Sequence, residues 1–257
     1  MISAGIDVGA ENTKVAIIDE ERILGWSVVP SGWDTQYSVQ LAFNAALNKA
    51  GIAENAVTRT CATGIGGRHT GFNSIFVTDS TSNARGVIWL WPSARTVIDM
   101  GAEQSQAMIL DDKGIILRYA RNDQCAAGAG AFITEMASVL EMSMEELSQA
   151  SLLSNNTLKI NSTCTIFAES EVISLVNEGH DKNDIARAVC DAIASKAASL
   201  AQELNITDEV VFIGGIARNA SVSKLLKEKI GREIIVPEEP RIVAAIGAAV
   251  AACGKQY

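Results

Sequence analysis

Two copies of one short motif place a carboxylate beside a glycine turn, and they lie 92 residues apart. Asp7 is followed by Gly9, and Asp99 is followed by Gly101. The surrounding segments are AGIDVGAENTKVAIIDEERILGW and TVIDMGAEQSQAMILDDKGIILRY. Both read as a strand, Asp-x-Gly-Ala-Glu, a second strand, an acidic turn and a third strand. An internal repeat of this length predicts two halves of similar structure.

A turn between hairpin strands exposes successive backbone N–H groups, which form a concave site for phosphate oxygens. Glycine in such a turn lets the backbone approach the phosphate closely. Asp7 and Asp99 are suited to Mg²⁺ and its waters. Thr13 and Lys14 add a hydroxyl and a cation, and Gly214-Gly215 follows an apolar strand where an adenine or ribose could approach. Together these residues predict a Mg-ATP site in a cleft between the two halves.

Two of the five cysteines lie in polar stretches immediately before a predicted helix: Cys125 in RNDQCAAGAGAF and Cys164 in NSTCTIFAESEVISL. A helix N-terminus stabilises a thiolate or an anionic cluster. A cubane iron–sulfur cluster takes four thiolates, and a symmetric dimer would supply the missing pair. The alternative for these two residues is a cap region with a buried cysteine. We expect Cys61, Cys190 and Cys253 to be small, buried apolar residues.

Composition excludes several classes of function. The chain has 257 residues with 21 basic and 30 acidic side chains, a net charge of −9, so we expect no nucleic-acid partner and no anionic membrane surface. No apolar run reaches the ~20 residues of a membrane span, and Asp7 and Glu11 interrupt any signal peptide. We therefore expect a cytoplasmic protein with reduced cysteines.

The hydrophobic pattern predicts an α/β fold. We expect strands at 3–8, 14–19, 23–29, 59–63, 96–100, 106–111, 115–119, 209–213 and 233–236. We expect helices at 38–50, 80–90, 127–140, 144–153, 166–177, 184–204, 221–230 and 243–252. The first half is expected to span 1–92, with the closing helix of 243–257 packed back on it, and the second half to span 93–242 and carry both cluster cysteines.

The order of the glycine motifs, Asp7-x-Gly9, Asp99-x-Gly101, Gly214-Gly215 and then Gly247, resembles the superfamily of actin, sugar kinases and heat-shock ATPases. The resemblance implies two ribonuclease-H-like halves that hold ATP and Mg²⁺, with hinge helices around 128–130 and 245–248. The site residues it implies are Asp7 and Asp99 as catalytic groups, and Gly9, Thr13, Lys14, Gly101, Ala102, Gly214, Gly215 and Asn219 as nucleotide-binding groups.

The cysteine segments NDQCAAGAGAF and STCTIFAESEVISL are similar to the signatures of 2-hydroxyacyl-CoA dehydratase activators, a family that includes the ATPase subunits of benzoyl-CoA reductase. The resemblance implies a homodimer with one [4Fe-4S] cluster, held by Cys125 and Cys164 of each subunit. It also implies an ATP-hydrolysing enzyme that passes one electron at low potential to an iron–sulfur dehydratase or CoA-ester reductase. The expected electron donor is a ferredoxin or a flavodoxin, and ADP is the product nucleotide.

The sequence departs from the activators in three places. Ala102-Glu103-Gln104 replaces Gly-Gln-Asp, so Glu103 or Gln104 is expected to orient the attacking water. Ala10-Glu11-Asn12 replaces small hydroxyl residues, and Arg241 replaces a neutral polar residue. The partner enzyme and its acyl-CoA stay open, as does the choice between a free activator and a fixed reductase subunit.

Two other functions fit the nucleotide motifs. A sugar-type kinase of the same superfamily could use Asp99 as its general base, but it leaves the paired cysteines unexplained. A non-catalytic scaffold could sense ATP by closing around it. Iron and sulfide in the anaerobically purified protein would distinguish the electron donor from the kinase.

Overall fold

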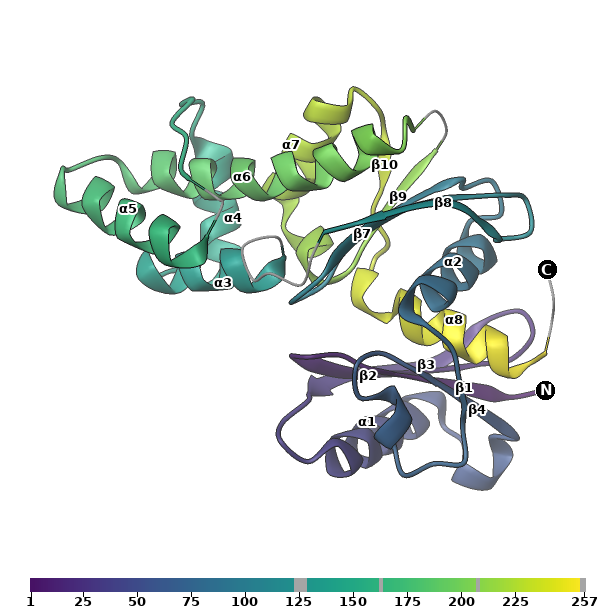
Figure 1. The fold of residues 1–257 in the computed structure, drawn as a ribbon. Helices are drawn as coiled ribbons and strands as arrows, with labels where there is room; N and C mark the ends of the chain where they lie inside the picture. Colours follow the sequence, from purple (N-terminus) through teal and green to yellow (C-terminus); the bar gives the residue numbers. More distant parts are fainter. Residues whose placement is uncertain (123–128, 162–163, 207–208, 255–257) are drawn as a thin grey trace. The chain divides into compact units, whose positions relative to one another are not determined.

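The computed structural model describes residues 1–122, 129–161, 164–206 and 209–254 (Figure 1). The chain divides into two compact units. The first unit comprises 1–97, 108–117 and 239–257, and the second comprises 98–107 and 118–238. The expected domain boundary near Pro92 stays a prediction. None of the helices in the described residues is long and apolar enough to cross a membrane.

The first sheet has five strands in the order β3-β2-β1-β4-β5. They are β1 (Ser3–Val8), β2 (Asn12–Ile18), β3 (Ile23–Pro30), β4 (Arg59–Thr63) and β5 (Ile75–Phe76). β1 is antiparallel to β2 and parallel to β4. Asp7 at the end of β1 therefore faces Lys14 on one neighbour and Thr63 on the other.

The second sheet repeats this order as β10-β9-β6-β7-β8. Its strands are β6 (Thr96–Met100), β7 (Ser105–Leu110), β8 (Ile116–Arg121), β9 (Val210–Ile213) and β10 (Ile234–Ile235). β6 occupies the place of β1, and β9 that of β4. The predicted α/β fold with two similar halves is confirmed, because a repeat in sequence has become a repeat in strand order.

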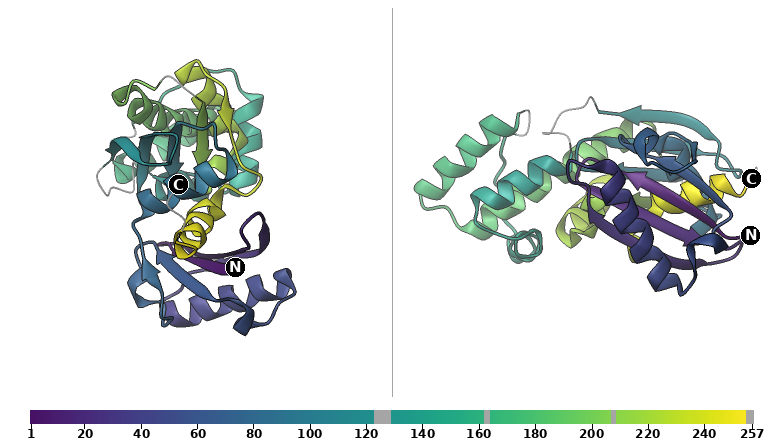
Figure 2. Two further views of the ribbon diagram at one scale, coloured as in Figure 1. Left: turned by 90° about the vertical axis from the view of Figure 1, so that its right-hand side faces the viewer. Right: turned by 90° about the horizontal axis from the view of Figure 1, so that it is seen from below.

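Helices cover both faces of the first sheet. α1 (Thr35–Ala50) begins at the Asp34 cap and ends at Gly51 in the left-handed region. Its Val39 and Phe43 pack on one face in a core with Ile6. α8 (Val243–Ala252) packs on the other face, over the strands at the N-terminus (Figure 2, left). Coverage from both sides explains why every residue of β1 is buried.

α8 also packs against α2 (Asp79–Leu90), and glycines make this contact possible. A Cβ on Gly247 would lie 1.7 Å from the Ser82 carbonyl oxygen, and one on Gly86 would lie 2.2 Å from that of Val243. A Cβ on Gly5 of β1 would lie 1.8 Å from the Ala245 carbonyl oxygen. The backbones of β1, α2 and α8 therefore touch where side chains would normally separate them.

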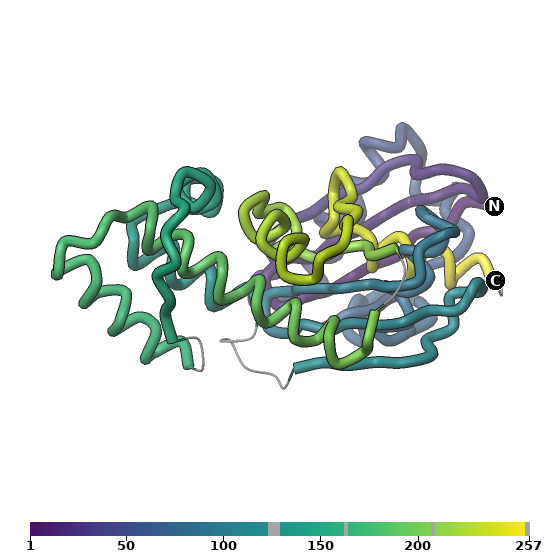
Figure 3. The backbone as a smooth tube through the Cα atoms, turned by 90° about the horizontal axis from the view of Figure 1, so that it is seen from above, coloured from purple at the N-terminus to yellow at the C-terminus, as the bar shows by residue number. Residues whose placement is uncertain are grey.

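The described residues of the second unit form the α-helices α3 (Gly130–Val139), α4 (Met144–Leu153), α5 (Thr165–Asn177), α6 (Lys182–Glu203) and α7 (Ala220–Ile230). α6 is one continuous helix that leads from the region of α3, α4 and α5 back to β9 (Figure 3). α4 and α7 pack against α6, and α3 packs against α5.

The structure adds short elements that the hydrophobic pattern did not predict. They are the 3₁₀ turns η1 (Glu54–Ala56), η2 (Gly67–His69), η4 (Gly215–Arg218) and η5 (Pro240–Ile242), together with β5. Such turns are too short to show a period in the sequence. The expected helix start at 127 lies outside the described residues.

Gly247→Ala tests the close contact of α2 with α8. The added methyl must displace the Ser82 backbone, and overpacking of this severity costs about 3 kcal/mol in the free energy of unfolding. Urea unfolding should show a lower midpoint at unchanged slope. Gly215→Ala is the matched control, since its Cβ meets nothing within 4 Å. Equal midpoints for the two variants would show that the helices do not touch at Gly247.

Candidate functional site

Both Asp-x-Gly turns close with the same backbone hydrogen bond. The Gly9 N–H donates to the Asn12 carbonyl oxygen at 3.0 Å, and the Gly101 N–H donates to the Gln104 carbonyl oxygen at 2.9 Å. The predicted repeat thus extends to the geometry of individual turns. A turn closed in this way holds its backbone groups at the end of a hairpin, where a phosphate can approach.

Asp7 is buried at the end of β1 and forms an ion pair with Lys14, with 3.0 Å between Nζ and Oδ2. A Cβ on Gly9 would lie 2.7 Å from the same Nζ, so the glycine leaves room for the lysine. Burial raises the pKa of Asp7, Lys14 lowers it, and the nearby Asp79 carboxylate raises it further. The net shift is upward, which shows that desolvation outweighs the ion pair.

Asp79, the first residue of α2, reaches the same turn region from another element. Its Oδ1 accepts hydrogen bonds from the Thr63 hydroxyl at 3.0 Å and from the Gly64 N–H at 2.7 Å. We did not predict this residue from the sequence. An acidic residue in the first turn of a helix is ordinarily explained by the helix dipole, so its type and position carry no further signal.

Asp99 has a different partner from Asp7. The Gln106 amide donates to Asp99 Oδ2 at 2.8 Å, and the Tyr119 hydroxyl donates to Gln106 Oε1 at 3.0 Å. Gln106 occupies the repeat position of Lys14. One half therefore pairs its aspartate with a cation, and the other pairs it with a neutral amide held by a tyrosine.

A glycine in the left-handed region follows the adjacent strand in each half. Gly64 has φ +86°, and a Cβ on it would lie 2.4 Å from the Val8 carbonyl oxygen and 2.7 Å from Asp7 Oδ1. Gly214 has φ +90°, and a Cβ on it would lie 2.3 Å from the Met100 carbonyl oxygen and 2.6 Å from Asp99 Oδ1. The two glycines are structural counterparts, because each lies against the carboxylate of its own half.

The remaining predicted nucleotide residues differ in exposure. A Cβ on Gly215 meets nothing within 4 Å, so this position is open. Glu103 is exposed, whereas Gly101, Ala102 and Gln104 are half-buried. Ala102 accepts a hydrogen bond from the Ala131 N–H at 2.8 Å, and α3 therefore begins against this turn.

Two predicted nucleotide residues turn their side chains inward. Thr13 is fully buried, and its hydroxyl lies 3.0 Å from the Ser31 hydroxyl, which itself donates to the Gly9 carbonyl oxygen at 2.7 Å. Asn219 is buried and caps α7 by accepting from the Val222 N–H at 3.0 Å. Both residues therefore support the backbone of a predicted site segment.

Cys164 is the N-cap residue of α5, and its thiol is half-buried and free. Its side chain makes no capping hydrogen bond, so the free N–H groups of the first helical turn remain beside it. Such an end favours a thiolate ligand. The described residues contain no group of three or more metal-ligating side chains, so Cys164 needs sulfur donors from elsewhere. Cys125 lies outside the described residues.

Of the other described cysteines, two are buried and Cys253 is half-buried. Cys61 and Cys190 are buried, and burial raises the pKa of each thiol to about 11. Cys253 lies with its sulfur 3.1 Å from the Ser3 hydroxyl. Thiols with raised pKa values are poor metal ligands and nucleophiles.

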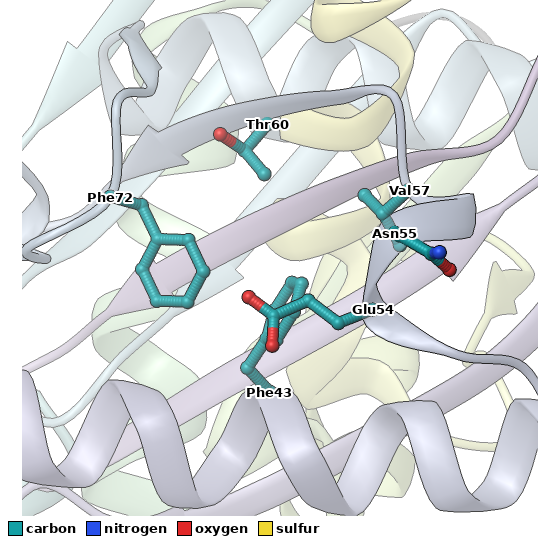
Figure 4. Close-up of a pocket in the computed structure, with 6 residues that line it drawn as sticks. All are labelled: Phe43, Glu54, Asn55, Val57, Thr60 and Phe72. Carbon is teal, nitrogen blue, oxygen red and sulfur yellow. The ribbon is translucent and has the colours of Figure 1, made fainter.

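A separate pocket of about 500 Å³ opens beside α1 in the first unit (Figure 4). The Phe43 and Phe72 rings form its apolar side, with their centroids 4.8 Å apart. None of the predicted site residues lines it. The lining residues are Phe43, Glu54, Asn55, Val57, Thr60 and Phe72.

Lys14→Met tests the electrostatics around Asp7. Loss of the cation should raise the pKa of Asp7 further, because desolvation and Asp79 then act unopposed. A carboxyl with a raised folded pKa contributes stability below its unfolded value of 3.8, and this stability is lost as pH rises through the folded pKa. The Lys14→Met variant should therefore lose this contribution to stability over a pH range that extends higher than in the parent protein. Carboxyl ¹³C titration checks the shift, and an unchanged titration would contradict the ion pair.

The comparisons with known proteins agree with this geometry. The activator of lactoyl-CoA dehydratase from Anaerotignum propionicum is 36% identical over 97% of this chain and 96% of its own length. The activator of the 2-hydroxyisocaproyl-CoA dehydratase from Clostridium difficile, solved with bound ADPNP, has a TM-score of 0.92 and 34% identity over 98% of this chain and 94% of that one.

The Acidaminococcus fermentans (R)-2-hydroxyglutaryl-CoA dehydratase component A has a TM-score of 0.94 and 33% identity, covering 100% of this chain and 99% of that one. These neighbours confirm the predicted actin-like ATPase fold. The model of the BadF/BadG/BcrA/BcrD ATPase family matches residues 4–252, nearly the whole chain. With its duplicated Asp-x-Gly turns and its cysteine at a helix N-terminus, this chain belongs to the BadF/BadG/BcrA/BcrD ATPase family.

Proposed function

We propose that this protein is an ATP-dependent electron donor that activates a 2-hydroxyacyl-CoA dehydratase or a related CoA-ester reductase. In this proposal one electron passes from a [4Fe-4S] cluster bridging two copies of the chain. The observation that carries the proposal is Cys164, a free thiol at the N-terminus of α5. The names of the relatives support it, since three are activators of dehydratases and one is a benzoyl-CoA reductase subunit.

The nucleotide part of the proposal assigns phosphate binding to the backbone of Ala102 and of the turns at Gly9 and Gly101, whose own N–H groups close the turns. Gly214 and Gly215 allow the close approach of the ligand, and Lys14 adds positive charge. Asp7 and Asp99 orient Mg²⁺ through its waters. Thr13 and Asn219 act indirectly, because their buried side chains hold the backbone near Gly9 and at the start of α7. Glu103 or Gln104 orients the attacking water.

The cluster part of the proposal assigns two thiolates per chain, Cys125 and Cys164. A bound [4Fe-4S] cluster would supply a single low-potential electron. Four thiolates require two chains, so the cluster site lies on the two-fold axis of a homodimer. Cys164 is the N-cap residue of α5, and the dipole of a helix N-terminus favours an anionic centre at that position.

The exposed face of α5 supports the homodimer. Ile166 and Phe167, directly after Cys164, are 70% and 67% exposed, and Ile173 and Val176 are also exposed. Only Ala168 and Val172 of this helix are buried. An uncovered apolar strip that begins at a proposed ligand is the surface expected to meet its symmetry mate.

Coupling to ATP requires two conformations with different nucleotide affinities. A shift of such an equilibrium from 1:99 to 99:1 takes about 5.5 kcal/mol of differential binding. In the proposal the nucleotide turns bind ATP with different affinity in the two conformations. The end of the dimer that contains α5 is exposed to the acceptor in only one of them. A ferredoxin or flavodoxin then reduces the protein again. We place the activity in the cytoplasm, where thiols stay reduced.

Gly215→Val is a clean test of the nucleotide site. The position is open, so the variant should fold with an unchanged urea midpoint. ADP binding, measured by calorimetry, should weaken at least tenfold because the side chain occupies the space that the ligand must approach. Ala53→Val is the matched control, because it adds a valine at an exposed position with extended backbone outside the predicted site. Unchanged ADP affinity in Gly215→Val would place the nucleotide elsewhere.

Cys164→Ser tests the cluster and separates the proposal from a sugar-type kinase. The anaerobically purified variant should lose its iron and sulfide while ADP affinity stays within a few-fold. Cys190→Ser is the matched control, since that thiol is buried in α6 and should leave iron content unchanged. Full iron content in Cys164→Ser would contradict the ligand assignment. Sugar-dependent ATP turnover without iron would instead favour the kinase.

A further inference from the structure

The pocket beside α1 is lined only by residues of the first unit, and the proposed function uses none of them. Three elements contribute to it: Phe43 comes from α1, Glu54 from η1 and Thr60 from β4. Gly51, in the left-handed region, ends α1 and lets the chain turn toward η1. The pocket volume of about 500 Å³ lies within the range of about 300–1,000 Å³ that is typical of small-molecule sites.

Most of the pocket wall is apolar. Phe43 belongs to the core of the first unit, and Val57 and Phe72 are partly buried residues that pack against this core. The Thr60 hydroxyl donates a hydrogen bond to the Asn73 carbonyl oxygen at 3.3 Å, so it is already engaged. A wall of this composition favours a ligand with an apolar body.

Glu54 is the charged residue of the lining. Figure 4 shows its carboxylate extending from η1 in front of Phe43 and toward the Phe72 ring. The Glu54 side chain forms no ion pair and no hydrogen bond with any residue that the structure describes. An unpaired carboxylate directed into an apolar pocket is the group that would orient a ligand there.

The basic residues nearest to Glu54 in the sequence are engaged elsewhere. Lys49 Nζ lies 3.9 Å from the centroid of the Trp26 ring, and Arg59 donates to the Ala252 carbonyl oxygen at 3.4 Å. A carboxylate attracts a cation, and the negative face of an aromatic ring does so too. The pocket therefore combines two kinds of cation-binding group, while its lining residues include no positive charge.

We propose that this pocket binds a small organic ammonium ion, an amine whose aliphatic or aromatic body fills the apolar part. The ammonium group pairs with Glu54 and lies against the Phe72 ring, and the body packs on Val57 and Phe43. The occupant is a free amine, in keeping with the volume of a small-molecule site. The inference is independent of the proposed function, because no lining residue has a role in nucleotide or cluster binding.

Phenethylammonium is a suitable probe, since it joins an ammonium group to an aromatic body. In a titration of the full chain followed by amide ¹H–¹⁵N spectra, it should shift the signals of Val57, Thr60 and Phe72 at millimolar concentration. Its affinity should fall as salt is added, because the contact is between charges. The neutral analogue 2-phenylethanol, of nearly the same shape, should bind about threefold more weakly.

Glu54→Gln removes the charge and retains the shape of the side chain. Because Glu54 is exposed, the urea midpoint should not change. Affinity for phenethylammonium should fall about threefold, whereas affinity for 2-phenylethanol should stay the same. Glu21→Gln is the matched control, since Glu21 is also exposed and its loss changes the net charge equally, but it does not line the pocket.

Three outcomes would overturn the proposal. Equal affinity for the amine in Glu54→Gln and Glu21→Gln would show that the carboxylate takes no part. Unchanged amide signals of Val57, Thr60 and Phe72 at millimolar amine would show that the pocket does not bind it. Tighter binding of Nα-acetyl-lysine amide than of phenethylammonium would assign the pocket to a lysine side chain of another protein.

Discussion

The two Asp-x-Gly turns depend on one steric constraint, the contact of a left-handed glycine with the neighbouring strand. In each half the strand beside the Asp-x-Gly hairpin ends in such a glycine, Gly64 or Gly214. Its backbone lies so close to a carbonyl oxygen and to an aspartate that no Cβ fits. Any other residue would suffer both this clash and the cost of a positive φ. Because the contact includes the aspartate itself, the geometry of the carboxylate follows from the glycine.

A second set of close backbone contacts holds the first unit together. Gly5, Gly86 and Gly247 allow β1, α2 and α8 to touch without intervening side chains. The consequence reaches the candidate site, because α2 begins at Asp79 and Asp7 is the penultimate residue of β1. Fixing α2 against α8, and α8 against β1, fixes the two carboxylates relative to each other. Packing far from the chemistry thus decides which acidic groups share one turn.

Duplication has produced two turns with the same backbone but different electrostatics. The first pairs its aspartate with Lys14 and lies beside Asp79, whereas the second pairs its aspartate with Gln106, held by Tyr119. A lysine contributes a point charge, while a glutamine contributes only an oriented dipole. The two copies of the repeat therefore share a backbone geometry but differ in charge beside their aspartates.

The amino-acid sequence by itself determined the repeat, the longer helices and strands, the glycine turns and the position of Cys164 before a helix. These features depend on local spacing: alternation along strands, helical periodicity, and glycine or cap residues at element ends. It did not reveal Asp79, because an acid at a helix start has no distinctive local signal. Nor did it show that Thr13 faces Ser31 or that Asn219 caps α7. Those facts depend on which side of an element the core covers and on which distant segments meet, and only the tertiary structure decides that.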